Sequence, residues 1–203
     1  MDLIKKDSCE SQKEILISLK DKIWFTYKAR MYAHKRLDFY DVHTQFILIW
    51  YSLSLVIISV ISLRIDKLYG SNTDIIITCL SIIVLILTLT VTTRDFRGRA
   101  ISMRENYLGL QRLYNEIDTN VKTASQIADE YHHYLSKGEN HYSIDDIAQR
   151  VMTKNLTSRI PSCTENSIFY SSVIIRYTII FILYILPAIL IYHAALKVNF
   201  MLS

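Results

Sequence analysis

Three long runs of apolar residues dominate the pattern along the chain. They cover residues 46–63, 75–91 and 177–196, and none of them contains an acidic residue, a lysine or an arginine. At about 1.5 Å per residue, each run predicts a helix roughly 25 to 30 Å long, close to the hydrocarbon thickness of a bilayer. Three such runs, separated by charged segments, predict an integral membrane protein.

The polar segments between the apolar runs carry helical periodicity of their own. Residues 12–43 contain no glycine or proline, and their apolar positions recur mostly at spacings of three or four, which predicts a long amphipathic helix leading towards the first span. Residues 99–136 repeat this pattern as a near-heptad seam, which needs a partner helix. The partner is either the helix over residues 12–43 or a second subunit. The seam consists of Leu110, Leu113, Ile117, Val121, Ala124, Ala128, Tyr131 and Leu135.

Turn and cap signals divide the remainder of the chain. Ser136 to Tyr142 predicts a loop, Ser143 is expected to cap a new helix with its hydroxyl, and Ile160 to Asn166 predicts a hinge before the third span. The predicted fold is an all-α integral membrane protein: a two-span antiparallel hairpin with long cytoplasmic helices and a third C-terminal transmembrane helix. Its expected segments are a cytoplasmic helix (1–44), the hairpin (45–93), a cytoplasmic helical segment (94–172) and the third transmembrane helix with a short tail (173–203).

Basic residues next to the spans predict the orientation. Those before the first span and after the second are expected to lie at a cytoplasmic membrane surface: Lys28, Arg30, Lys35, Arg36, Arg94, Arg97, Arg99 and Arg104. The net charge of +4 is therefore mainly a signal of topology. Residues 92–172 balance ten basic side chains with ten acidic ones, which argues against direct nucleic-acid binding.

Hydroxyl side chains form a stripe on each of the first two spans. At 100° per residue, the hydroxyls of the second span fall within a sector of about 80°, and those of the first span form a similar stripe. The stripes either pack helices together or line a weakly polar pore in an oligomer. They consist of Ser52, Ser59 and Ser62 in the first span and Thr78, Ser81, Thr88 and Thr92 in the second, whereas Ser54 and Thr90 lie off them.

The chain offers little that could carry catalysis. The spans hold no internal acidic or basic side chain, which argues against a proton-coupled pump. His132, His133 and His141 lack the spacing of a helical metal pair, and the three cysteines form no CxxC motif. We therefore expect no enzyme activity, no cofactor, no metal site and three free thiols.

Two stretches around the hairpin resemble the bacterial SLATT domain family. Residues 24–36 (WFTYKARMYAHKR), followed by Asp38 and Asp41, are similar to its N-terminal helix, and residues 94–117 (RDFRGRAISMRENYLGLQRLYNEI) are similar to its segment after the second span. The resemblance covers about residues 15–135. The third span is similar to that of the branch encoded beside reverse transcriptases.

The resemblance implies an oligomeric membrane effector of antiphage defence. Such a protein would sit in the bacterial inner membrane with its N-terminus in the cytoplasm, in contact with lipid. A partner encoded nearby, either a reverse transcriptase or a nucleotide-second-messenger system, would trigger it to form a pore or disrupt the membrane, causing abortive infection. The alternative is a non-conducting anchor that recruits a soluble partner such as a reverse transcriptase.

Overall fold

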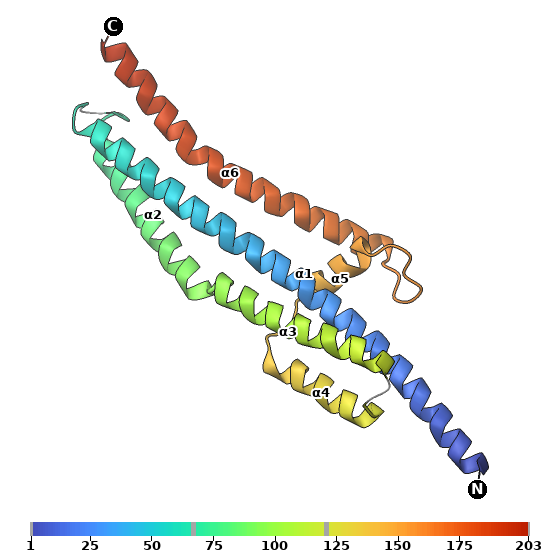
Figure 1. Ribbon diagram of the computed structural model, residues 1–203. Coiled ribbons are helices and arrows are strands. Elements are labelled where there is room, and N and C mark those ends of the chain that lie inside the picture. Colours follow the sequence, from blue (N-terminus) through green and yellow to red (C-terminus); the bar gives the residue numbers. More distant parts are fainter. Residues whose placement is uncertain (1, 66–67, 120–121, 203) are drawn as a thin grey trace. The chain divides into compact units, whose positions relative to one another are not determined.

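The computed structural model shows an all-helical chain, with no strand among the residues that it describes (Figure 1). It describes the backbone of residues 2–65, 68–119 and 122–202, and the side chains of residues 12–65, 68–119 and 122–200. The elements are α1 (Asp2–Ser62), α2 (Thr73–Arg94), α3 (Phe96–Glu116), the 3-10 helix η1 (Ile117–Thr119), α4 (Ala124–Lys137), α5 (Ser143–Met152) and α6 (Cys163–Leu202). The expected all-α class is confirmed.

The first helix is a single element of 61 residues. It has no glycine or proline in its length, so nothing in the backbone interrupts it. The helix expected over residues 12–43 lies inside α1 and continues into the first apolar run. It ends before a loop in which Gly70 has a φ of 94°, a left-handed conformation that other residues rarely adopt.

Contacts divide the chain into two units. We call Met1–Asp38 with Arg97–Tyr170 the polar unit, and Phe39–Phe96 with Ser171–Ser203 the apolar unit. Each unit is built from segments far apart in the sequence.

The core of the polar unit joins α1 to the two helices after the second apolar run. Ile23 of α1 is buried against Leu113, Ile117 and Ile127. The helix over residues 12–43 was one of two expected partners for the seam, and these contacts confirm it. Val121 of the seam lies outside the described residues, and Ile127, which the seam did not include, takes the buried position in α4.

The prediction of one helix over residues 99–136 is wrong, because α3 ends at Glu116 and a separate helix begins at Ala124. Thr123 is the N-cap of α4: its Oγ1 accepts from the amide of Gln126 at 3.4 Å, and the Gln126 side chain accepts from the amide of Thr123 at 2.9 Å. This capping box satisfies amides that a continuous helix would have used internally. The capping residues Thr123 and Gln126 therefore start a new helix, although the apolar periodicity of the seam continues across this point.

The α3 and α4 helices pair as an antiparallel hairpin, as Figure 1 also shows. Lys122 bonds Glu116 at 2.7 Å near the turn, and Asn106 Nδ2 donates to the Tyr134 carbonyl at 2.8 Å further along. A Cβ on Gly109 would collide with the ring of Tyr134. A larger residue at position 109 would have to displace this ring.

Two helix starts differ from the sequence predictions. The start of α5 at Ser143 is confirmed, but its N-cap is Tyr142, whose amide donates to the Asp145 carboxylate at 2.9 Å, so the prediction of a Ser143 cap is wrong. The expected hinge up to Asn166 is too long, since α6 already begins at Cys163. Ser162 and Glu165 form reciprocal bonds there, and this capping box starts the helix early.

Candidate functional site

Three helical stretches, which include α1, α2 and α6, are long and apolar enough to cross a membrane by length and composition. The most exposed is α2, in which Thr73 is the only buried residue. An apolar helix with so little cover from its own chain needs lipid or another protein chain around it. Its large exposed side chains are Ile75, Ile82, Ile83, Leu85, Ile86 and Leu89.

The predicted hydroxyl stripe of α2 is exposed along with this apolar surface. Thr78, Ser81, Thr88 and Thr92 are all exposed, and each hydroxyl donates to a carbonyl one turn earlier in the same helix, at 2.7 to 2.8 Å. The off-stripe Thr90 does the same at 2.8 Å. Because the hydroxyls are satisfied inside their own helix, the stripe can face lipid, another helix or water.

The hydroxyl stripe of α1 is less uniform. Ser52 is exposed, whereas Ser59 and Ser62 are half-buried and bond carbonyls of their own helix at 2.8 and 2.7 Å. The off-stripe Ser54 is buried and bonds the Trp50 carbonyl at 2.6 Å. The structure therefore does not bring the α1 hydroxyls onto one exposed face. Whether either stripe lines a pore stays a prediction.

Side-chain hydrogen bonds tie α6 to the rest of the apolar unit, and sequence reasoning missed them. Trp50 Nε1 donates to the Tyr184 carbonyl at 3.1 Å, and the Tyr69 hydroxyl donates to the Leu190 carbonyl at 2.9 Å. Tyr184 lies one residue after Leu183, whose carbonyl has no helical donor because Pro187 lacks an N–H. Pro187 marks this turn in the sequence as one with disturbed helical bonding, but it does not identify either acceptor.

The eight basic residues expected at a membrane surface have different environments. Arg30 is fully buried in the polar unit, so the prediction of a surface role is wrong for this residue. Arg36 makes a bidentate pair with Asp145 at 2.8 and 2.9 Å, and Arg99 makes one with Glu139 at 2.7 and 2.6 Å. Lys35, Arg94, Arg97 and Arg104 are exposed, and Lys28 is half-buried.

The burial of Arg30 follows from its place in the periodicity. It shares the inward face of α1 with Ile23, Ala33 and Leu37. Because other basic residues surround it in the sequence, the pattern of charge alone did not distinguish this buried arginine from its exposed neighbours. Its Nη1 donates to Asn106 Oδ1 and, at 2.9 Å, to the Tyr134 carbonyl. Burial lowers the pKa of the guanidinium, which nevertheless stays protonated.

This buried charge is incompletely bonded. Nε and Nη2 of Arg30 have no hydrogen-bond partner, and no acidic side chain within the described part of the chain pairs with the guanidinium. The side chain of Gln149 is also fully buried, with neither polar atom bonded. Burial and the charge of Arg30 both lower the pKa of the nearby His141. Buried groups of this kind store free energy that hydration would release.

Ion pairs also fix the end of the polar unit where α5 meets α6. Arg150 bonds both carboxylate oxygens of Glu165, at 3.0 and 2.5 Å, and Asp146 at 3.0 Å. The Arg150 guanidinium and the Ser162 amide hold the pKa of Glu165 at about 2. These bonds fix where α6 starts relative to α5.

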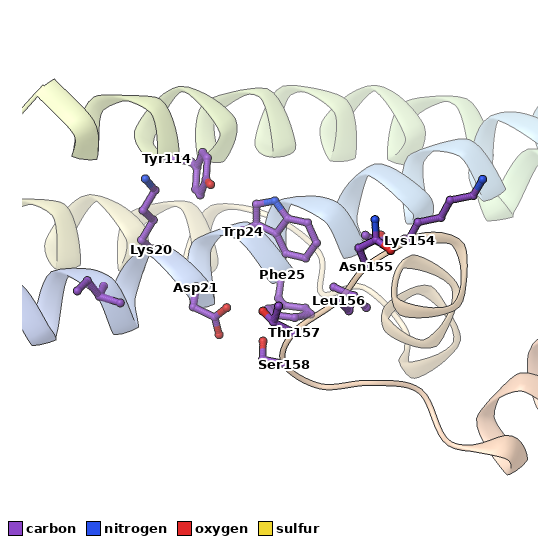
Figure 2. Close-up of a pocket in the computed structure, with 12 residues that line it drawn as sticks. Lys20, Asp21, Trp24, Phe25, Tyr114, Lys154, Asn155, Leu156, Thr157 and Ser158 are labelled. Carbon is purple, nitrogen blue, oxygen red and sulfur yellow. The ribbon is translucent and has the colours of Figure 1, made fainter.

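A groove of about 400 Å³ lies in the polar unit between α1 and the loop after α5 (Figure 2). Trp24 and Phe25 of α1 and Tyr114 of α3 give it an aromatic wall. Asn155 of the loop also lines the groove, and its backbone has a left-handed conformation with a φ of 59°. The guanidinium of Arg159 stacks on Phe25 at 4.3 Å from the ring centre, which holds the loop against α1.

Metal ligands do not gather in the described residues, where no group of three or more His, Cys, Asp or Glu side chains could hold an ion. Cys79 and Cys163 are exposed free thiols, and the side chain of Cys9 lies outside the described residues.

These features define an all-helical membrane protein with an apolar unit and a polar unit. The chain belongs to the SMODS and SLOG-associating 2TM effector domain family 5, whose model matches residues 12–193. The match extends into α6 and so includes all three apolar runs almost completely. No curated protein and no solved structure matches the chain. Membership in a family of two-transmembrane effector domains gives the chain a membrane effector role.

Proposed function

We propose that the chain is a non-catalytic effector of bacterial antiphage defence that assembles into an oligomer in the inner membrane. Its N-terminus lies in the cytoplasm. A partner or second messenger triggers it to open a pore or disrupt the membrane, so that the infected cell dies before phage mature.

The exposed face of α2 is the observation that carries this proposal. Apart from Thr73, no residue of this helix is buried, and one side of it carries Thr78, Ser81, Thr88 and Thr92. The hydroxyls are bonded within α2 and tolerate lipid, but in a hydrocarbon environment a fully apolar face would serve equally well, so the row of hydroxyls favours contact with other helices or with water. Since the chain leaves this face uncovered, copies of α2 around an axis are its best partners.

The trigger must favour the open state strongly. Shifting the equilibrium from 1:99 to 99:1 requires a preference of about 5.5 kcal/mol for the open state over the closed one. Tight binding that does not distinguish the two states would change nothing. The underbonded Arg30 supports a polar unit able to rearrange, because a rearrangement that hydrates this guanidinium recovers part of its desolvation free energy.

The alternative function is a non-conducting anchor, and the surface of the polar unit supports it. Ile101 and Leu108 of α3 are 51% and 46% exposed, seven residues apart on one side of the helix. The groove at Trp24 gives a second place where a partner could bind. A soluble partner such as a reverse transcriptase would then bind residues 99–165 in detergent, while overexpression leaves the membrane potential unchanged.

The deciding experiment is a measurement of membrane potential with a voltage-sensitive dye, in bacteria that express the chain alone and with its genomic neighbours. Depolarisation before growth arrest supports the pore, and its dependence on one neighbour identifies the trigger. An intact potential with normal membrane abundance, even during phage challenge, rejects the pore and favours the anchor.

A matched pair of variants tests the lining. Ser81→Leu with Thr88→Leu removes two stripe hydroxyls, and we expect it to abolish toxicity, and the depolarisation that precedes it, at unchanged membrane abundance. Thr90→Leu removes an off-stripe hydroxyl that makes the same bond to its own helix, and it should leave depolarisation intact. Unchanged killing by the double variant would reject this lining.

A further inference from the structure

Arg176 is the last charged residue before the third apolar run, and it lies in the apolar unit without a polar partner. The side chain is half-buried, and its Nε is fully buried with no hydrogen bond. Among the described residues, Arg176 makes neither an ion pair nor a hydrogen bond. A guanidinium in this position, next to a membrane span, requires an anionic acceptor or water.

Aromatic rings hold this guanidinium at the start of the run. Its central carbon lies 5.0 Å from the ring centre of Phe39 and 5.7 Å from that of Tyr177, and these two rings meet edge-on at 5.5 Å. An arginine stacked on an aromatic face keeps its N–H donors in the plane of the guanidinium, where a phosphate can be bound by two of them. The stacking thus orients the group without using its donors.

A largely apolar groove of about 660 Å³ begins at Tyr177, whose ring contacts the Arg176 guanidinium, and follows α6 into the apolar run. His43 and Tyr184 form part of it, with the ring nitrogen Nδ1 and the hydroxyl 3.4 Å apart. Its α6 residues run from Tyr177 to Tyr184, which is about 10 Å along the helix axis. This length matches the upper part of an acyl chain below a headgroup at the membrane boundary.

We propose that Arg176 and this groove form a binding site for an anionic phospholipid. The phosphate of the lipid binds the guanidinium, Phe39 and Tyr177 hold that guanidinium in place, and one acyl chain lies in the groove along α6. The occupant needs both a negative headgroup and a hydrocarbon chain, because the site combines an unpaired cation with apolar walls. This inference requires α6 to lie in a membrane, but it does not depend on pore formation.

The test uses full-length protein in detergent, titrated with phosphatidylglycerol or phosphatidylcholine and followed by native mass spectrometry. We expect the wild-type protein to bind phosphatidylglycerol about tenfold more tightly, because its headgroup has a net negative charge, whereas the choline cation of phosphatidylcholine offsets the charge of its phosphate. Arg176→Gln should remove this preference. The control is Arg94→Gln, which removes the same charge from the last turn of another apolar helix, at a residue that does not line this groove, and it should keep the preference.

A second variant tests the groove separately. Ile180→Trp fills the groove and should weaken binding of both lipids, whereas Arg176→Gln alters only the discrimination between them. Circular dichroism and size-exclusion chromatography check folding, and if Arg176→Gln is misfolded, Arg176→Lys must lower the preference instead. Equal losses in the Arg94 and Arg176 variants, no preference in the wild type, or complete displacement of the lipid by inorganic phosphate would overturn the proposal.

Discussion

Arg30 is a charged side chain that is fully buried and has few hydrogen-bond partners. A guanidinium with no exposed surface ordinarily lies against a carboxylate, but here it has only an amide and a carbonyl as acceptors. Asn106 serves both helices of the hairpin, since its amide nitrogen donates to the same Tyr134 carbonyl. Asn106 therefore links the buried guanidinium to both helices of the hairpin.

Asn106→Ala should destabilise the polar unit by about 2 kcal/mol, because it leaves a buried guanidinium with a single acceptor. Arg30→Met should cost less, since it removes the buried charge together with its need for partners. Chemical unfolding of the full chain in detergent, followed by circular dichroism, compares the two. A larger loss for Arg30→Met than for Asn106→Ala would show that the guanidinium is well compensated after all.

His141 should make the stability of the polar unit fall in mild acid. Burial and the charge of Arg30 lower its pKa below the ordinary 6.5, against the opposing influence of Asp146 and Asp145. The unfolded chain therefore binds a proton more readily than the folded one, so stability is lost as the pH falls from about 6.5 towards the folded pKa. His141→Asn should flatten this part of the pH profile, measured as unfolding midpoints at several pH values. His133→Asn alters an exposed residue and should leave the profile as it is.

The helices of this protein are predictable where the apolar periodicity is uninterrupted. They are less predictable where capping residues determine the position at which a helix starts. The long α1 follows from a sequence without glycine or proline, and the three apolar runs follow from hydropathy. The break between α3 and α4 was missed because the heptad pattern continues across it, while Thr123 and Gln126 already carried the capping signal. The early start of α6 was missed for the same reason, at Ser162 and Glu165.

Thr123→Ala should weaken the start of α4 by about 1 kcal/mol, because it leaves the amide of Gln126 without its side-chain acceptor. Hydrogen exchange should quicken in the first turn of α4 and hardly change in α5. Ser125→Ala alters an exposed hydroxyl of the same turn that does not cap the helix, and it should leave exchange unaffected. Equal exchange in both variants would mean that packing, and not the cap, holds this helix start.

The molecule as a whole has two kinds of unit. The polar unit has a core formed by its own residues, whereas much of the apolar surface of the apolar unit is exposed. Pattern and composition predicted the apolar runs, but they could not show which basic residues turn inward, since Arg30 and Lys35 lie on the same basic stretch and differ only in helix face. Nor could they show that Trp50 bonds the turn before Pro187, because that contact joins segments 134 residues apart. The candidate site was predictable as a set of hydroxyls on α2, and its exposure emerged only from the fold.

The proposed oligomer predicts that two copies of the chain meet at the exposed face of α2. Ser81 lies on the hydroxyl stripe, whereas Thr90 points about 180° away from it at 100° per residue. In a full-length chain with Cys9, Cys79 and Cys163 replaced by serine, Ser81→Cys should form disulfide-linked dimers under mild oxidation in membranes. Thr90→Cys, at equal abundance, should form few.

The pattern of cross-links separates assembly through this face of α2 from a face that contacts only lipid. Cross-linking that favours position 81 means that stripes from two copies approach within disulfide distance, about 4 Å between Cβ atoms. Cross-linking at position 90 alone would turn the interface to the opposite side of α2, leaving the stripe to lipid. If neither position cross-links, α2 does not mediate assembly, and the hydroxyls serve only their own helix, where each already has a carbonyl acceptor.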